Sequence, residues 1–445
     1  MKDVLIVGGG ITGLTLAWAL GERGIDTQVL EMRPHAGGNI RTLRLDNYLI
    51  DLGPNSLLER PGQGLAQILD ALSLRPHVVE ANPIASRRYV SRDGRALALP
   101  MSPMAFLRTP IFSLMGKLRL LQEPFIKPAS EEESVAAFVC RRLGPEFLDW
   151  AVDPFISGVY AGDAEKLSVR AATAKVYALE AESGSLIRGA LKRARQGRAS
   201  GPVPRGRLIG FHPGMQALPD ALADRLGDRL KTGTAVTTLR RDTNAWKVGT
   251  ENETFAAKRL ILATPAYATA DLLASFDARL AEDLRAIEYP GVVNLALGFA
   301  RETIAHPLDG FGLLIPRREG KETLGVLFSS TLFPGRAAEG KALLTAFIGG
   351  ARNPEVYLRE NDDLIARVIE DLKPLLGISG EPEFAHVTRW PRAIPQYTLG
   401  HLERLARIDQ AASALPDLHL AGNWRGGIAV GDCIDNALAL AEKLA

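Results

Sequence analysis

The sequence predicts an α/β protein, α+β overall, in which a discontinuous Rossmann-like nucleotide-binding domain carries an inserted helical domain and a β-sheet substrate domain. Three observations predict this fold. A strand, a glycine turn, a helix and a second strand follow one another over residues 4–31. A second strand, glycine turn and helix unit closes the chain at residues 419–445. Between them lie a long, mostly helical stretch and a region of alternating apolar residues.

The N-terminal unit has the element order of a dinucleotide-binding βαβ motif. An apolar strand at 4–7 leads into the glycine turn GGGITG at 8–13. A helix is predicted over 14–23, and the second strand, 27–30, ends on Glu31. Strand, turn, helix, strand and acid occur together in the expected order, so the motif is much more specific than an isolated GxGxxG.

Each residue of the turn has a physical role in such a motif. Gly8 allows the tight turn, Gly10 leaves room for a pyrophosphate beside the backbone, and Gly13 lets helix and strand approach closely. The helix N-terminus offers free N–H groups and a partial positive charge to the phosphates. Glu31 can accept hydrogen bonds from ribose hydroxyls, and its charge disfavours a cofactor with a 2′-phosphate.

A second glycine pair, Gly37-Gly38, lies just beyond the ribose acid. It lets another backbone segment approach a bulky ligand, which a nicotinamide cofactor does not require and flavin enzymes commonly show. The pattern therefore favours FAD. Taken alone, the pair would be read as a surface turn.

Composition limits the classes of function. The chain has 445 residues, 46% of them hydrophobic and 23% charged, so one to three soluble domains are expected. A net charge of +2 gives no reason to expect nucleic acid as a partner. With two cysteines, neither a disulfide framework nor a zinc site is expected, and an intracellular setting is favoured. The histidines are scattered along the chain, so no metal site is predicted from them. The N-terminus does not have the pattern of a signal peptide.

One stretch, residues 101–126, is unusual in composition. It is rich in Met, Phe, Leu and Ile, is interleaved with basic residues, and is interrupted by prolines. No segment has about 20 uninterrupted apolar residues, so a membrane-spanning helix is not expected. The stretch can lie in a membrane interface or pack on the protein's own core, and composition alone favours the core.

The order of predicted elements gives five segments. Residues 1–83, 206–289 and 408–445 are predicted to form the FAD-binding domain, 84–205 the helical, membrane-binding insertion, and 290–407 the substrate domain. Helices are predicted at 134–150, 171–194, 216–226 and 362–376, strands at 232–239, 260–265, 292–299, 324–328 and 343–348, and a loop at 196–207.

Several sequence blocks together resemble one family. They are residues 8–14, 37–42, 53–56, 87–90, 157–163, 310–316, 394–401 and 431–434. These blocks resemble the FAD-dependent amine-oxidase superfamily and, within it, the oxygen-dependent protoporphyrinogen oxidases. SGVYAGD at 157–163 and IPQYTLGH at 394–401 are the most specific blocks, and the resemblance spans nearly the whole chain.

The resemblance implies a function. Family members hold FAD non-covalently and remove six electrons from protoporphyrinogen IX, a tetrapyrrole, in two-electron steps, while O2 becomes H2O2. The resemblance also implies a cytoplasmic enzyme that contacts the inner face of the cell membrane peripherally, through the helical insertion. A homodimer is one option for its oligomeric state. A coproporphyrinogen III oxidase of the same family is the alternative, and a non-catalytic flavin-binding protein is an alternative of another class.

The resemblance also implies which residues contact FAD. Most lie at the two glycine turns, in the segment 53–56 and at the start of the last helix. By motif they are Gly8, Gly9, Gly10, Ile11, Thr12, Gly13, Glu31, Met32, Asn39, Gly53, Pro54, Asn55, Ser56, Val236, Trp390, Ile428, Ala429 and Val430.

For the substrate, the resemblance implies an apolar sandwich, a cation and a few contacts near the flavin ring. The implied residues are Leu313, Leu327 and Phe347 for the sandwich, Arg88 for a propionate, and Asn55 and Gly158 near the flavin ring. The three apolar residues can equally be core, and Arg87 is an adjacent candidate for the propionate. No side chain is predicted to act as general acid or base, because the cofactor supplies the electron acceptor.

Overall fold

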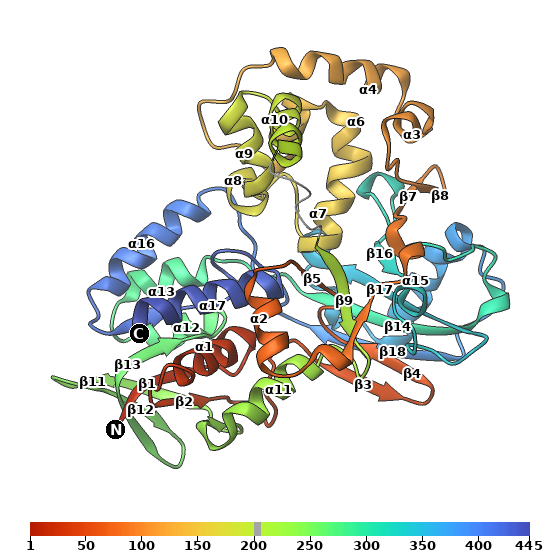
Figure 1. The fold of residues 1–445 in the computed structure, drawn as a ribbon. Helices are drawn as coiled ribbons and strands as arrows, with labels where there is room; N and C mark the ends of the chain where they lie inside the picture. Colours follow the sequence, from red (N-terminus) through yellow and green to blue (C-terminus); the bar gives the residue numbers. More distant parts are fainter. Residues whose placement is uncertain (200–205) are drawn as a thin grey trace.

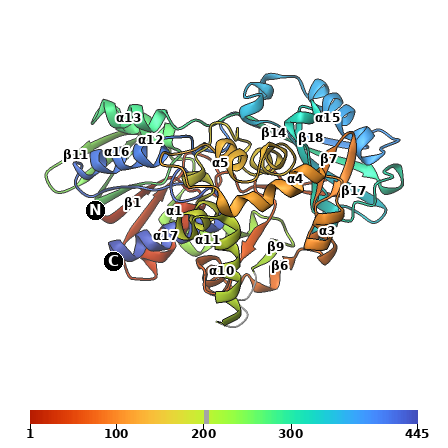
Figure 2. The same ribbon diagram turned by 90° about the horizontal axis from the view of Figure 1, so that it is seen from above.

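A computed structural model describes residues 1–199 and 206–445. Two large sheets lie side by side in the lower half of Figure 1, and a group of helices rises above them. Seen from above, the first sheet with its helices and the second sheet lie at opposite ends of the molecule, with the helical region between them (Figure 2).

The first sheet is assembled from distant parts of the chain. Its strand order is β10-β2-β1-β13-β12-β11, with β19 paired to β13. Pairing is parallel between β1, β2, β10, β13 and β19, and antiparallel through β12 and β11. The strands are β1 (Lys2–Val7), β2 (Thr27–Leu30), β10 (Leu230–Lys231), β11 (Val236–Arg241), β12 (Trp246–Thr250), β13 (Thr254–Leu262) and β19 (Leu418–Leu420).

Apolar side chains of β1 alternate between the two faces of this sheet, and helices bury both faces. Val4 and Ile6 pack with helices of one face, and Leu5 and Val7 with helices of the other. The first face is covered by α1 (Ile11–Gly21), α11 (Ala217–Leu226) and α17 (Val430–Leu444). The second is covered by α12 (Ala266–Leu273), α13 (Ala278–Arg285) and α16 (His401–Ser413). Apolar residues on both faces are expected of strands in a parallel sheet.

The second sheet has the order β18-β14-β17-β16-β15-β7-β8. Its pairs are antiparallel except for β15 with β7. The strands are β7 (Tyr89–Arg92), β8 (Arg95–Ala98), β14 (Val292–Ala300), β15 (Gly312–Leu314), β16 (Thr323–Leu327), β17 (Lys341–Gly349) and β18 (Phe384–Trp390). Helix α15 (Asn361–Leu376) covers one face. The hairpin β7–β8 lies inside the stretch that the sequence predicts to be mostly helical.

The helical region is more broken than the sequence suggests. The predicted helix 134–150 ends at Arg142, because Gly144 takes a left-handed φ of +97° and Pro145 follows. The helices here are α3 (Pro103–Arg108), α4 (Leu114–Arg119), the 3₁₀ turn η3 (Leu120–Phe125), α5 (Val135–Arg142), α6 (Pro145–Phe147), a π-helix (Leu148–Val152), α7 (Asp153–Tyr160), α8 (Val169–Ala172), α9 (Ala174–Ser183) and α10 (Leu186–Ala199).

Smaller elements join these parts. Strands β3 (Thr42–Leu45) and β4 (Tyr48–Asp51) form a hairpin, while β9 (Arg207–Phe211) pairs with β5 (Leu57–Glu59) and β6 (Val78–Glu80), and α2 spans Gly64–Ala71. Of the predicted loop 196–207, residues 196–199 belong to α10, and 200–205 lie outside the described residues. No helix in the described ranges is long and apolar enough to cross a membrane. The predicted domain boundaries stay predictions.

Candidate functional site

The glycine turn after β1 lies at the carboxyl edge of the first sheet. Gly8 has a left-handed φ of +109°, which favours glycine. A Cβ on Gly13 would lie 2.0 Å from the Gly8 carbonyl oxygen. The predicted close approach of helix α1 to strand β1 is therefore confirmed, and any side chain at Gly13 would push the helix away.

The start of α1 is open to a ligand. Its N-cap is Gly10, and no described side chain caps the free N–H groups of the first turn. A Cβ built on Gly10 would meet no atom within 4 Å. Unpaired amide donors and a partial positive charge thus face open space, which is what a pyrophosphate requires.

The start of α17 repeats this arrangement. Its N-cap, Ala429, makes no side-chain cap, and a Cβ on Gly431 would also meet nothing within 4 Å. The side chain of Cys433 on α17 hydrogen-bonds Thr12 on α1, so the two helix starts are neighbours. Burial raises the pKa of the Cys433 thiol to about 11, so it stays protonated at neutral pH. Two adjacent helix N-termini create one region of positive potential.

Glu31 links the glycine turn to the loop after β2. Its carboxylate is 7% exposed and accepts hydrogen bonds from the Gly9 N–H at 2.6 Å and the Arg33 N–H at 2.8 Å. A carboxylate offers about four acceptor positions, so two remain for other donors such as ribose hydroxyls.

The second glycine pair packs directly against the first turn. The Gly37 N–H donates to the Gly9 carbonyl at 2.8 Å, and Gly37 is buried with a φ of +101°. A Cβ on Gly38 would lie 3.4 Å from the Gly10 Cα. The interpretation of this pair as an isolated surface turn is therefore wrong.

The other residues predicted to contact FAD surround this edge. A Cβ on Gly53 would lie 1.9 Å from the Asn39 carbonyl oxygen, so these two segments are in contact. The Trp390 indole N–H donates to the Leu52 carbonyl at 3.0 Å. Met32 is 69% exposed, beside the loop that Glu31 holds. Their contacts with FAD stay predictions, as do those of Ile11, Thr12, Pro54, Asn55, Ser56, Val236, Ile428, Ala429 and Val430.

The apolar residues predicted for the substrate do not share one face of the second sheet. Register pairs Leu314 with Gly325 and Gly325 with Phe347, and it pairs Leu327 with Thr345. Leu314, Leu327 and Phe347 therefore lie on one face, and each is only partly buried.

Leu313 lies on the opposite face from Leu327 and Phe347. It pairs with Val326, is 1% exposed, and packs in the core beneath α15. Its neighbour Leu314 occupies the open face instead. A Cβ on Gly158 of α7 would lie 2.5 Å from the Leu314 Cδ2, so Gly158 faces the same side. Leu313 is therefore a core residue, as one of the two interpretations of the sequence expected, and it does not share a face with Leu327 and Phe347.

The two adjacent arginines differ in their partners. Arg87 is ion-paired with Asp309, which also accepts the Tyr89 hydroxyl at 2.5 Å. The Tyr89 hydrogen bond and then the Arg87 charge hold the pKa of Asp309 below its ordinary value. Arg88 is exposed, and its guanidinium lies 5.1 Å from the Phe311 ring centroid. Of these two arginines, only Arg87 has an ion pair within the described ranges, so the Arg88 guanidinium is left without a carboxylate partner.

A buried ion pair near Asn55 was not predicted from the sequence. Asp51 and Arg336 are 2.7 Å apart, and both are almost fully buried. Asp51 also accepts hydrogen bonds from the Thr42 hydroxyl at 2.6 Å and the Met215 N–H at 2.8 Å. Burial raises the pKa of Asp51, and Arg336 opposes that shift. A cavity of about 10 Å³ beside this pair is also lined by Asn55. No sequence pattern predicted the contact between Asp51 and Arg336, because the two residues are distant in the chain.

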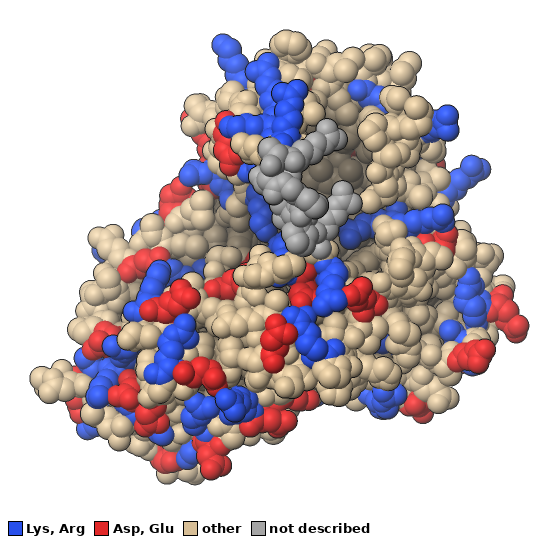
Figure 3. Space-filling model, viewed as in Figure 1, with Lys and Arg blue, Asp and Glu red and all other residues tan. Residues whose placement is uncertain are grey.

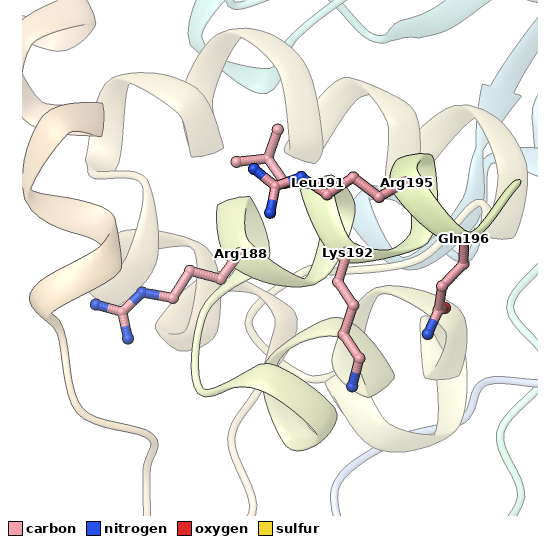
Figure 4. Close-up of a pocket in the computed structure, with 5 residues that line it drawn as sticks. All are labelled: Arg188, Leu191, Lys192, Arg195 and Gln196. Atoms are coloured by element: carbon pink, nitrogen blue, oxygen red, sulfur yellow. The ribbon is translucent and has the colours of Figure 1, made fainter. Parts of the chain in front are cut away.

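A larger hollow, of about 300 Å³, lies away from this edge on α10. Arg188, Leu191, Lys192, Arg195 and Gln196 line it (Figure 4). Figure 3 shows Lys and Arg side chains gathered over the helical region at the top of the view. This hollow contains none of the predicted site residues and belongs to the basic surface of the helical region.

The fold and the sheet edge define a dinucleotide-binding protein, and comparison with known proteins shows that it is a flavin-dependent oxidoreductase. Residues 11–445 match the family model described as flavin containing amine oxidoreductase, and the chain belongs to that family. Its cofactor is FAD, as predicted, and the open starts of α1 and α17 fit its pyrophosphate and ring.

Two curated relatives cover nearly the whole chain. The chloroplastic protoporphyrinogen oxidase of Nicotiana tabacum is 34% identical over 99% of this chain and 85% of its own. The coproporphyrinogen III oxidase of Bacillus subtilis (strain 168) is 32% identical over 98% of this chain and 97% of its own.

Solved structures agree on the fold. A candidate protoporphyrinogen oxidase from Exiguobacterium sp. 255-15 has a TM-score of 0.84 at 23% identity, covering 99% of this chain and 98% of its own. The cyclohexylamine oxidase of Brevibacterium oxydans IH-35A has a TM-score of 0.72 at 16% identity, covering 100% and 98%. At these identities the two structures support the predicted fold alone.

Proposed function

We propose that this enzyme oxidises protoporphyrinogen IX to protoporphyrin IX, with O2 as the electron acceptor and H2O2 as the product. The observation that carries the proposal is the open apolar face of Leu314, Leu327 and Phe347, with Gly158 opposite and the cofactor segment 51–55 beside it. The Asn294 side chain on this face donates to the Leu52 carbonyl at 3.2 Å, which joins the face to that segment. Relatives named as porphyrinogen oxidases support the substrate class.

The residues of this face have roles that suit a large apolar macrocycle. Leu314, in place of Leu313, would cover the macrocycle together with Leu327 and Phe347. Gly158 leaves the space opposite them, and Asn55 lines the cofactor side. The free guanidinium of Arg88 would pair with a propionate in a charge-assisted hydrogen bond.

The chemistry divides between cofactor and protein. Bound FAD would supply the two-electron acceptor for each oxidation step of the macrocycle. The chain positions the macrocycle, excludes water with its apolar face, and stabilises negative charge near the start of α17. No side chain is assigned as general acid or base.

Coproporphyrinogen III is the alternative substrate, because the Bacillus subtilis relative is nearly as similar as the plant one. Its four propionates would need cations besides Arg88. The deciding experiment measures O2 consumption and porphyrin fluorescence with each porphyrinogen under the same conditions. We expect the larger kcat/KM with protoporphyrinogen. A larger value with coproporphyrinogen selects the alternative, and FAD uptake without oxidation of either substrate selects a non-catalytic flavoprotein.

We further propose that the enzyme associates peripherally with the inner face of the cell membrane through α3, α4 and η3. The residues that support this are apolar and largely exposed: Met101, Met104, Leu107, Leu114, Met115, Leu118, Leu121 and Phe125. Exposed apolar clusters of this kind mark interaction surfaces, and Arg108, Lys117 and Arg119 lie between them.

A vesicle flotation assay tests the membrane proposal. We expect the enzyme to float with anionic vesicles and the Leu114→Ser/Met115→Ser/Leu121→Ser variant to stay at the bottom. Leu358→Ser is the matched control, because Leu358 is 67% exposed but lies near the second sheet. Equal flotation of both variants would exclude this surface as the membrane contact.

A further inference from the structure

His401, the first residue of α16, is a buried side chain to which the proposed chemistry gives no role. It is 1% exposed, and within the described residues its ring nitrogens make no hydrogen bond of good geometry, although the ring lies beside the Trp424 backbone. Burial, reinforced by the charge of Arg404, lowers its pKa to about 4, so the ring is neutral at physiological pH. Its contact with Tyr397 is a stack, with ring centroids 4.3 Å apart and planes at 13°.

Tyr397 in turn holds the loop that leads into α17. Its hydroxyl is buried, donates to the Asn423 carbonyl at 2.6 Å, and accepts from the Gly427 N–H at 3.0 Å. One hydroxyl group therefore joins the two sides of the turn 423–427. Among the described residues the hydroxyl has no charged partner, and it holds two backbone groups.

Residues of the loop also make contacts of their own, such as the ion pair of Arg425 with Asp409, and two glycines allow its shape. Gly426 and Gly427 have left-handed φ values of +74° and +124°. A Cβ on Gly427 would lie 2.5 Å from Asp432 Oδ2 in the first turn of α17. The position of this glycine therefore sets where α17 begins. The loop has a second anchor in the Trp424 indole N–H, which donates to the Thr264 carbonyl at 3.2 Å.

Tyr397 is also fixed from the side of the helical region. Its carbonyl accepts from the Ser168 N–H at 2.8 Å. Its neighbour Gln396 donates to the Tyr160 carbonyl at 2.9 Å. These contacts join the two most specific sequence blocks, 157–163 and 394–401. The residues assigned to the substrate do not explain why these two blocks meet here.

We propose that Tyr397, held by its stack on His401, is a positioning residue for the flavin. Its hydroxyl fixes the turn 423–427 and thereby the open N-terminus of α17, whose backbone N–H groups would favour reduction of a flavin ring bound beside them, with Asp432 as the acidic residue of that first turn. The inference rests on FAD binding and not on the identity of the porphyrinogen. Loss of the hydroxyl should loosen the helix start and make the flavin harder to reduce.

The test measures the flavin in the purified holoenzyme without substrate. For Tyr397→Phe we expect a more negative midpoint potential, an altered visible flavin spectrum, and a roughly 3- to 10-fold fall in kcat at unchanged KM, as for one lost hydrogen bond. Tyr48→Phe is the matched control, because the Tyr48 hydroxyl donates at 2.6 Å to Glu383, in the second sheet region. The control should keep the wild-type potential and spectrum.

A second variant keeps the test decisive if Tyr397→Phe is not recovered folded. His401→Leu removes the stack and retains an apolar side chain of similar size, so we expect a smaller shift of the potential in the same direction. His401→Phe keeps a ring on Tyr397 and should restore the wild-type value. A wild-type potential, spectrum and kcat in Tyr397→Phe, or a wild-type potential in His401→Leu, would overturn the proposal. An enzyme inactive with porphyrinogens would still report its flavin potential, so failure of the proposed substrate is distinguishable.

Discussion

Two adjacent leucines provide a sharp test of the proposed substrate face. Leu313 is 1% exposed beneath α15, whereas Leu314 is partly exposed on the open face. Truncation of a buried leucine to alanine costs about 2–5 kcal/mol, so Leu313→Ala should lower the free energy of unfolding by that amount. Leu313→Ala should change kcat/KM little in the fraction that stays folded.

Leu314→Ala should have the opposite profile. Covering a leucine side chain with an apolar ligand contributes about 1.5–3 kcal/mol, which corresponds to roughly 10- to 100-fold in kcat/KM. Its melting temperature should fall less than that of Leu313→Ala, because Leu314 is already partly exposed. Thermal unfolding and O2 consumption with protoporphyrinogen, measured on both variants, give the two quantities. A wild-type kcat/KM in Leu314→Ala would refute the assignment of this face.

Gly158 extends the same test to the other side of the face. An alanine there would place its Cβ 2.5 Å from the Leu314 Cδ2, so the leucine would have to turn into the space proposed for substrate. Gly158→Ala should therefore lower kcat/KM, and the loss in the Gly158→Ala/Leu314→Ala double variant should be smaller than the product of the two single losses. Strictly additive effects in this double-mutant cycle would show that the two residues do not share a space.

Three further predictions concern the cation, the glycine turn and pH. Arg88→Ala should raise KM for the porphyrinogen while FAD stays bound, by a factor that corresponds to about 1.5–3 kcal/mol of binding free energy. Arg87→Ala should raise KM less. Equal KM values for Arg88→Ala and wild type would exclude the propionate role. Gly13→Val should abolish FAD retention, because its Cβ would lie 2.0 Å from the Gly8 carbonyl oxygen; a normal flavin spectrum in the purified variant would contradict this. The pKa of His401 is lowered from 6.5 to about 4, so its neutral form is favoured in the folded state. The contribution of His401 to the free energy of unfolding is therefore fully present above pH 6.5. It falls by about 3 kcal/mol in all as the pH drops towards 4. His401→Phe should lose that part of the pH dependence in denaturant titrations, and an unchanged slope would show that His401 does not titrate in this way.

The first sheet could be predicted from sequence because its signals are local. Its parallel strands are short apolar runs, and the glycine turn, the helix and Glu31 follow at fixed spacing. The C-terminal strand and helix unit repeats the pattern. The structure confirms that β19 joins this sheet beside β13.

The hairpin β7–β8 was missed although its signal is present. Asp93 and Gly94 both have left-handed φ values, +52° and +71°, as a type I′ hairpin turn requires. The Asp-Gly pair between two alternating runs is a strong local sign of a hairpin. Composition over the longer stretch outweighed it in the sequence interpretation.

The register of the substrate face could not be read from a motif. Strand β15 is three residues long, and moving by one residue exchanges the two faces of a sheet. Only pairing with β16 and β17 decides that Leu314 shares a face with Phe347. The ion pair of Asp51 with Arg336 depends in the same way on contacts between distant segments.

The two open helix ends connect the fold with its cofactor in energetic terms. Described side chains cap neither α1 nor α17, so the first N–H groups of both helices face open space and are left to water in the cofactor-free protein. Bound FAD would supply the missing acceptors, and a ligand that binds only the folded state stabilises it by mass action. These ends can remain open because the glycines at positions 10 and 431 place no side chain in front of them. The stability that FAD adds therefore depends on these same open ends, and cofactor binding and stability should change together in variants of this edge.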